Sequence, residues 1–130
     1  MFDWEGYLRL AEELSKSKDN ESHLRAAVSR AYYAAYNVAR RYIEEEKPDL
    51  AIDGGSHQKI WNAFPKNTPG AKSIETGINI NGFKLQGYRV EADYRTHAKN
   101  FDRTALYAIS LSKSIITSVS SLRRSRQSAR

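Results

Sequence analysis

The sequence contains no cysteine, so it can form neither a disulfide framework nor a metal site built on thiolates. No apolar run approaches the roughly 18–20 residues that a membrane span requires. The three histidines stand far apart, without the spacings typical of zinc or calcium ligands. The chain also lacks a glycine-rich phosphate-binding loop and a serine-nucleophile motif. We therefore expect no metal and no other cofactor.

What is present is the composition of an ordinary globular domain. Hydrophobic residues make up 40% of the chain and charged residues 28%, which is enough apolar material for one core. The N-terminal stretch MFDWEGYLRLAEEL carries acids where a secretory signal peptide has basic and then purely apolar residues. We expect a cytoplasmic protein that does not associate with membranes.

The net charge of +6 is concentrated at the C-terminus. The last eight residues, RRSRQSAR, contain four arginines and no acid, and the rest of the chain has 17 basic and 15 acidic residues. We therefore divide the chain into a domain over residues 1–122 and a basic, flexible tail over residues 123–130. Such a tail either stays solvated or contacts phosphates without sequence specificity.

Apolar residues recur at helical spacing through most of the chain. They predict a first helix over 3–17 with Asp3 as N-cap, a second from Asn20 or Ser22 to Glu46, and a short third over 57–64 capped by Ser56. A fourth helix is predicted over 71–95, although the Asn-Gly pair at 81–82 could form a hairpin turn instead. A fifth runs from Asp102 or Thr104 to about Arg124. With no convincing strand, the predicted fold is an all-α helical bundle.

Three stretches of the sequence resemble a known family. They are SRAYYAAYNVAR at 29–40, GSHQKIWNAF at 55–64 and YRVEADY at 88–94. In this order and at these separations they resemble the HEPN domain, a nucleotide-binding domain of higher eukaryotes and prokaryotes. The resemblance covers roughly residues 5–122. It implies an up-and-down bundle of four to five helices that commonly forms homodimers.

The resemblance also implies functions. HEPN proteins often accompany a minimal nucleotidyltransferase in prokaryotic toxin–antitoxin and defence systems. Several are metal-independent ribonucleases whose signature is an arginine, four to six residues, and a histidine. Arg89 matches that arginine, but Tyr94 follows after four intervening residues and His97 only after seven. The candidate catalytic residues on this pattern are therefore Arg89 together with either His97 or Tyr94.

The chemistry of such a ribonuclease explains these residue types. RNA carries its own nucleophile, the 2′-hydroxyl group, so the enzyme supplies a group that moves protons and a cation that holds the phosphate. Histidine exchanges protons near neutral pH, and arginine can bind two phosphate oxygens at once. No metal is needed for either role.

Other candidate binding residues lie outside the Arg/His motif. Arg30, Tyr33 and Asn37 fall on a polar stripe of the second helix, which either forms part of a ligand groove or joins two helices. His57 stands at a helix N-terminus, a position that suits an anion or simply begins a capped helix. Asp93 could pair with Arg89, which would make that arginine structural.

These observations favour a HEPN-like module that binds a nucleotide, RNA or a partner protein without catalysis. The alternatives are a metal-independent ribonuclease of the toxin type and an interaction subunit for a separately encoded nucleotidyltransferase. The alanine-rich second helix and the surplus of aromatic residues further predict a homodimer.

Overall fold

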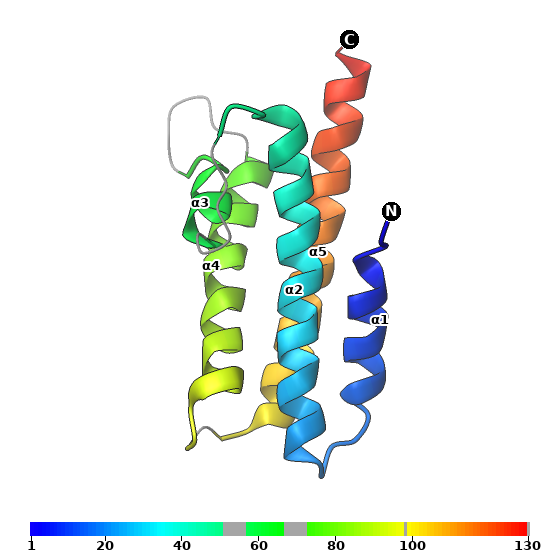
Figure 1. Cartoon of the computed structure of the whole chain (residues 1–130), viewed down its shortest axis with the longest axis vertical. Coiled ribbons are helices and arrows are strands. Elements are labelled where there is room, and N and C mark those ends of the chain that lie inside the picture. The colour runs from blue at the N-terminus through cyan, green and yellow to red at the C-terminus, as the bar shows by residue number, and fades with distance from the viewer. Residues whose placement is uncertain (51–56, 67–72, 98, 130) are drawn as a thin grey trace.

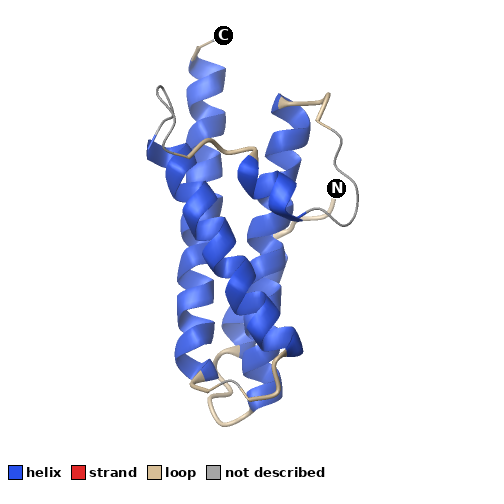
Figure 2. Cartoon of the chain, turned by 90° about the vertical axis from the view of Figure 1, so that its left-hand side faces the viewer, coloured by secondary structure: helices blue, strands red, loops and turns tan. Residues whose placement is uncertain are grey.

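A computed structural model of the chain describes residues 1–50, 57–66, 73–97 and 99–129. Its elements are α1 (Glu5–Leu14), α2 (Glu21–Glu46), α3 (His57–Asn62), α4 (Ser73–Tyr94) and α5 (Phe101–Ser128) (Figure 1). Figure 2 shows helices and loops, without a strand in the residues that it describes. The predicted all-α bundle of four to five helices is confirmed.

The central helix of the bundle is α2, which packs against all four other helices. The helices α1 and α4 lie on opposite sides of it (Figure 1). Much of its buried surface is alanine, whose short side chain lets neighbouring helices approach closely. The fully buried alanines of α2 are Ala27, Ala31, Ala34, Ala35 and Ala39.

The ends of α2 follow the sequence signals. The Asn20 side-chain oxygen accepts a hydrogen bond from the His23 backbone N–H at 3.1 Å, so Asn20 is the N-cap. The helix ends at Glu46, two residues before Pro48, because a proline disfavours helical geometry in the residue before it. The predicted cap of the third helix, Ser56, lies outside the described residues.

The first helix is shorter than predicted. It begins at Glu5 and ends at Leu14, with Trp4 rather than Asp3 at the N-cap position. The Asp3 carboxylate still accepts a hydrogen bond from the Glu5 backbone N–H at 3.0 Å, and it pairs with Arg9 at 3.0 Å. Asp3 therefore stabilises the start of α1 from the position just before the N-cap residue.

The Asn-Gly pair at 81–82 lies inside α4 and does not form a hairpin turn. Gly82 faces the indole of Trp61, and a Cβ atom at this position would lie 2.1 Å from Trp61 Cε3. The Asn79 side chain donates hydrogen bonds to the backbone carbonyls of Trp61 and Phe64, both at 3.0 Å. Gly82 is thus a notch in α4 that receives Trp61 of α3, and α3 lies beside α4 (Figure 1).

The C-terminal arginines continue the last helix, which differs from the separate tail expected over residues 123–130. The helix α5 extends to Ser128. Arg123 pairs with Glu45 at 3.1 Å, and Arg126 pairs with Glu46, whose side chain is only 12% exposed. The arginines extend the helix because acids at the end of α2 lie opposite them.

The start of α5 follows a residue with a left-handed backbone. Asn100 has φ 61°, a conformation that asparagine adopts more readily than most residues. The length and composition of α5 would allow it to cross a membrane. A buried core helix has the same properties, and α5 places the side chains of Ala105, Ala108, Ile115 and Val119 in the core.

Candidate functional site at Arg89

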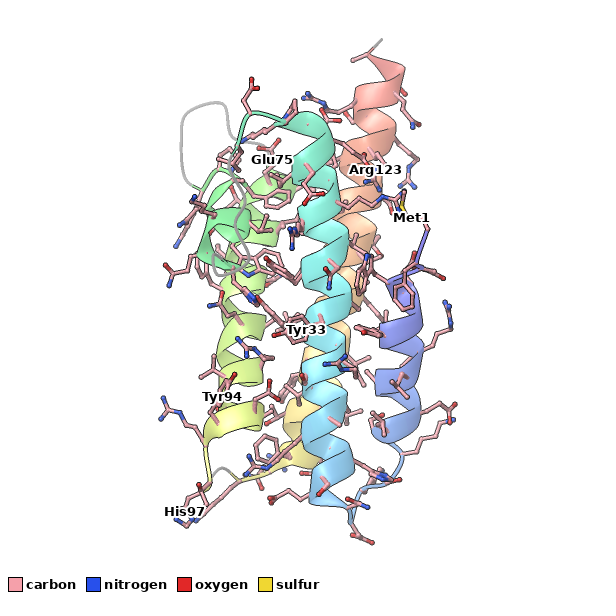
Figure 3. All side chains as sticks on the ribbon, viewed as in Figure 1. Met1, Tyr33, Glu75, Tyr94, His97 and Arg123 are labelled. Atoms are coloured by element: carbon pink, nitrogen blue, oxygen red, sulfur yellow. The ribbon has the colours of Figure 1, made fainter. Side chains whose placement is uncertain are left out.

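Arg89 is a residue of α4, and its side chain lies against one face of α2. Residues at steps of three and four along α2 share that face, and they place Ser29, Tyr32 and Tyr33 next to Arg89 and Asp93. The Arg89 guanidinium carbon lies 5.4 Å from the ring centre of Tyr32 and 5.7 Å from that of Tyr33. Cations are attracted to aromatic faces at such distances. Figure 3 shows Tyr33 between α2 and α4, about midway along the bundle.

The Arg89 guanidinium has few acceptors besides the Tyr94 side chain. Its side chain is 11% exposed, and the nearest carboxylate oxygen, Asp93 Oδ2, lies 3.5 Å from Nη1. The same Asp93 oxygen lies 3.4 Å from Ser29 Oγ, so both contacts are long for hydrogen bonds. Arg89 Nε is buried and has no hydrogen-bond partner among the described residues. Burying an unsatisfied donor of a charged group is costly.

Arg89 nevertheless keeps its positive charge. Burial alone would lower its pKa, but Tyr33, Tyr94 and Asp93 outweigh that effect and raise the pKa above its usual value. The guanidinium therefore stays positive at every physiological pH.

His57, the first residue of α3, is held by two tyrosines of α2. Its ring stacks on Tyr36 with the ring centres 4.3 Å apart, and its Nδ1 lies 2.7 Å from the Tyr32 hydroxyl. Trp61 Nε1 lies 3.3 Å from the same hydroxyl. An indole N–H can only donate, so the Tyr32 oxygen accepts from Trp61. The Tyr32 hydroxyl still has its own proton to donate, and among the described residues His57 Nδ1 is the group placed to accept it. We infer that His57 carries its proton on Nε2.

The electrostatics of the site agree with a neutral His57. Burial lowers the pKa of His57, and the positive charges of Arg89 and Arg40 lower it further. Burial also raises the pKa of Tyr32 and of Tyr36, which keeps both hydroxyls protonated. The site therefore combines the Arg89 cation and the Asp93 carboxylate with neutral hydrogen-bond donors. We call Arg89, Asp93, His57 and the three tyrosines Tyr32, Tyr33 and Tyr36 the Arg89 cluster.

Several of the residues predicted from the sequence meet at this site. Tyr33, His57 and Asp93 belong to the Arg89 cluster, and the Tyr94 ring centre lies 5.7 Å from the Arg89 guanidinium carbon. Arg30 borders the cluster, with its Nη2 at 3.5 Å from Ser29 Oγ.

Asn37 and the Arg30 guanidinium lie on the side of α2 that faces α1. The Arg30 guanidinium carbon lies 4.6 Å from the ring centre of Tyr7 in α1. Asn37 donates to the Tyr33 backbone carbonyl at 2.8 Å and lines a groove of about 360 Å³ together with Trp4. The predicted polar stripe of α2 is thus divided between two sides of the helix.

His97 lies away from Arg89. It is exposed in the turn after α4 and lines a groove of about 550 Å³ with Phe83, Gly87 and Val90, on another face of the helix. Figure 3 shows it at the end of the bundle, beyond Tyr94. The structure therefore brings His57, rather than His97, to the aromatic site of Arg89.

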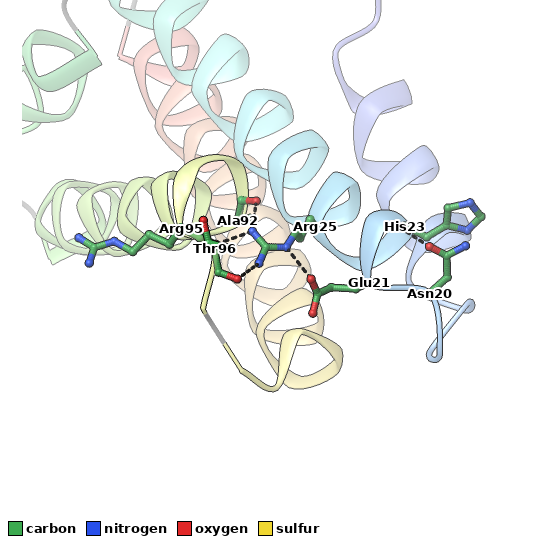
Figure 4. Close-up of polar contacts among 7 residues, drawn as sticks. All are labelled: Asn20, Glu21, His23, Arg25, Ala92, Arg95 and Thr96. Carbon is green, nitrogen blue, oxygen red and sulfur yellow. Dashed lines mark hydrogen bonds and ion pairs between the residues drawn. The ribbon is translucent and has the colours of Figure 1, made fainter.

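The position of His97 follows from contacts made by Arg25 of α2. Its Nη1 donates to the carbonyls of Ala92 at 2.9 Å and Arg95 at 2.7 Å, and its Nη2 approaches the Thr96 carbonyl at 3.4 Å (Figure 4). A cation at a helix C-terminus satisfies carbonyls that have no partner within the helix. Arg25 therefore fixes the end of α4 and the turn after it, and His97 does not fold back toward Arg89.

Sequence reasoning missed Tyr32, Tyr36 and Arg25 as residues of this region. The two tyrosines could have been found, because they stand three and seven residues after Ser29 and so share its face of α2. Arg25 carried no such signal, since most of its partners are backbone carbonyls far along the chain.

The side chains of the Arg89 cluster limit the kinds of ligand that the site can bind. In the part of the chain that the structure describes, no group of three histidine, aspartate or glutamate side chains could hold a metal ion. Comparison with protein-family models, with curated proteins and with solved structures finds no match to this chain. The residues of the site themselves offer a cation, a carboxylate, an imidazole N–H and aromatic rings.

Proposed function

We propose that the Arg89 cluster binds a phosphate of a nucleotide or of single-stranded RNA, and that the chain is a binding module rather than a nuclease. The observation that supports this most strongly is the incomplete pairing of Arg89, whose Nε is buried without a partner among the described residues while Asp93 Oδ2 lies 3.5 Å from Nη1. A phosphate group supplies several acceptor oxygens, and the flat guanidinium can bind two of them at once.

Aromatic rings beside the guanidinium favour a ligand that also carries a base. Tyr33 and Tyr94 both lie within 5.7 Å of the Arg89 guanidinium carbon, and Tyr94 is 73% exposed. Bases of single-stranded nucleic acids stack on exposed aromatic side chains. A nucleotide or a short stretch of RNA therefore matches the site better than an inorganic anion does.

The protonation of His57 favours binding over cleavage. With its proton on Nε2, His57 can donate a hydrogen bond to a phosphate oxygen, but this nitrogen cannot accept a proton from a 2′-hydroxyl group. The opposite tautomer would leave the Tyr32 hydroxyl proton without an acceptor among the residues that the structure describes. A non-catalytic module of this kind accords with the HEPN resemblance, which we retain as part of the proposal.

The proposal is tested by fluorescence anisotropy with a labelled single-stranded RNA of about ten nucleotides. AMP serves as the competitor. We expect Arg89→Ala to weaken RNA binding at least tenfold, about 1.4 kcal/mol. Arg89→Lys should recover little of the loss, because lysine is a point charge that cannot form the two parallel bonds. The control is Arg103→Ala, which removes an exposed arginine of α5 and should leave binding unchanged.

Two results would contradict the proposal. If Arg89→Ala binds RNA like the wild type and only loses stability, Arg89 is a structural partner of Asp93. If the wild-type chain cleaves the RNA in the presence of EDTA, and both Arg89→Ala and His57→Ala abolish the cleavage, the chain is a metal-independent ribonuclease.

A further inference from the structure

Arginine and tyrosine side chains alternate across the bundle from α4 to α1. Both arginines contact one ring, since the guanidinium carbons of Arg89 and Arg30 lie 5.7 Å and 5.4 Å from the ring centre of Tyr33. The Arg89 carbon also lies 5.7 Å from the ring centre of Tyr94, and the Arg30 carbon lies 4.6 Å from that of Tyr7. We call these five residues the arginine–tyrosine row. Because α2 packs against both α1 and α4, the row runs across the bundle rather than along it (Figure 1).

Arg30 differs from the other arginines of α2 in having no carboxylate partner. Arg25, Arg40 and Arg41 each form an ion pair with a glutamate four residues away. Arg30 forms no ion pair with a residue that the structure describes, and its one polar contact there is Ser29 Oγ, at 3.5 Å from Nη2. A guanidinium carries five N–H donors. Most of the donors of Arg30 are therefore available to a ligand.

The two arginines of the row together keep a net positive charge. Ser29 Oγ lies 3.5 Å from Arg30 Nη2 and 3.4 Å from Asp93 Oδ2. The same Asp93 oxygen lies 3.5 Å from Arg89 Nη1. Asp93 thus pairs with Arg89 alone, at a long distance, and Arg30 adds a second cation that no described carboxylate balances.

Beyond Tyr7 the row leads into an aromatic cluster at the start of α1. The ring centres of Trp4 and Phe2 lie 5.4 Å and 5.5 Å from that of Tyr7, and Phe2 is 54% exposed. Trp4 also lines the groove of about 360 Å³ on this side of α2, together with Arg40 and Arg41. Further rings and cations therefore continue the surface past the end of the row.

An alternation of cations and aromatic rings matches a ligand that alternates phosphates and bases. In complexes with single-stranded nucleic acids, bases stack on aromatic side chains and basic residues follow the phosphates. AMP has one phosphate and one base, which Arg89 and a neighbouring ring would engage, and it would leave Arg30 without a partner. A strand supplies a second phosphate for Arg30 and further bases for the tyrosines.

We propose that the arginine–tyrosine row is the path of a single RNA strand, which leaves the Arg89 cluster and crosses α2 toward α1, with Arg30 holding the phosphate next to the one at Arg89. This inference rests on the proposed function of the Arg89 cluster. It specifies the ligand as a strand with at least two linked phosphates rather than a mononucleotide, and it assigns Arg30 and Tyr7 to the binding surface.

The test compares two ligands that differ by one nucleotide, AMP and the 5′-phosphorylated dinucleotide pApA. Isothermal titration calorimetry measures both dissociation constants. The wild-type chain should bind pApA at least about tenfold more tightly than AMP. Arg30→Ala should raise the dissociation constant of pApA about five- to tenfold and leave that of AMP unchanged. The control Arg103→Ala removes an exposed arginine of α5 and should change neither constant.

The salt dependence of binding separates a phosphate contact from a structural role of Arg30. Each phosphate contact to a single strand contributes about 0.7 to the slope of log affinity against log salt concentration. With an RNA of about ten nucleotides, Arg30→Ala should lower this slope by about 0.7. Arg30→Lys keeps the charge and should keep the slope. Circular dichroism checks that both variants remain folded.

Two outcomes would overturn this inference alone. If Arg30→Ala binds pApA like the wild type while Arg89→Ala loses both ligands, the Arg89 cluster holds a mononucleotide and the row is not the path of a strand. If Arg30→Ala weakens AMP and pApA equally, Arg30 supports the Arg89 site and holds no second phosphate.

Failure of the proposed function has a different signature and overturns the strand path with it. In that case the wild-type chain binds neither ligand, or Arg89→Ala leaves both dissociation constants unchanged. The arginines and tyrosines of the row would then form a surface for a protein partner, since both residue types are also enriched where proteins bind one another.

Discussion

Gly82 and Gly87 stand five residues apart in α4 and differ in the atoms that an added side chain would meet. A Cβ atom at Gly82 would collide with the Trp61 ring at 2.1 Å, whereas a Cβ atom at Gly87 would meet nothing within 4 Å. A glycine inside a helix costs about 1 kcal/mol relative to alanine. At Gly82 the packing of Trp61 offsets that cost. At Gly87 no described residue offsets it.

The inner notch also builds the candidate site. Trp61 fills it and thereby holds α3 against α4, and His57 at the start of α3 then reaches Tyr32 and Tyr36. The indole N–H of Trp61 takes part in the same hydrogen-bond chain through Tyr32. The helix contact at Gly82 and the protonation of His57 are therefore linked.

The largest effect is expected from Gly82→Ala. The added methyl group must displace Trp61, and we expect the free energy of unfolding to fall by about 2–3 kcal/mol despite the better helix propensity of alanine. Urea denaturation followed by circular dichroism measures this, with Gly77→Ala as the control. A Gly82→Ala variant as stable as the wild type would show that Trp61 does not depend on the notch.

Arg25→Ala should destabilise the chain by about 1–2 kcal/mol, because it leaves carbonyls at the end of α4 without their donor. It also removes a guanidinium that lies 4.4 Å from the ring centre of Phe101. The same denaturation measurement applies, and Arg103→Ala controls for the loss of one positive charge. An equal stability of the two variants would mean that solvent replaces Arg25 at no cost.

Gly87→Ala is expected to act in the opposite direction to Gly82→Ala. In the monomer it should raise the free energy of unfolding by about 1 kcal/mol, as Gly77→Ala should. The measurement belongs at about 1 µM, where association of the chains contributes least. A loss of stability in Gly87→Ala alone would show that the position is closed within the monomer.

Removing residues 123–130 should have the smallest effect. It deletes the ion pairs of Arg123 with Glu45 and of Arg126 with Glu46. Ion pairs near the surface contribute little, so we expect a loss of about 0.5–1 kcal/mol that shrinks in about 1 M salt. The truncated chain should also bind RNA with a weaker dependence on salt concentration. A loss well above this range would make the end of α5 part of the core.

The sequence predicts those parts of the fold that depend on local signals. Asn20 caps α2, and Pro48 follows its end, because capping and the restriction before proline act within a few residues. The helical state of 81–82 was ambiguous, since an Asn-Gly pair suits a hairpin turn equally well. Contacts of Gly82 and Asn79 with α3 decide in favour of the helix, and these partners are distant in sequence.

The candidate site was predictable only in part for the same reason. Arg89, Asp93 and Tyr94 lie close together in sequence, so spacing could group them. His57 lies 32 residues before Arg89, and only the packing of α3 brings it near. His97 is close in sequence but is carried away by the contacts of Arg25 with the turn. Helix α5 continues past Arg124 because of acids on α2, which local propensity does not reveal.

The most direct test of phosphate binding at Arg89 is the pKa of His57, measured by NMR titration between about pH 5 and 8 with and without saturating AMP. In the free chain burial, Arg89 and Arg40 hold this pKa below its usual value. A bound phosphate beside Arg89 stabilises the imidazolium form, so the pKa of His57 should rise. The rise should be absent in Arg89→Ala. A His57 pKa that does not change when AMP is added, or that rises equally without Arg89, would contradict phosphate binding at this site.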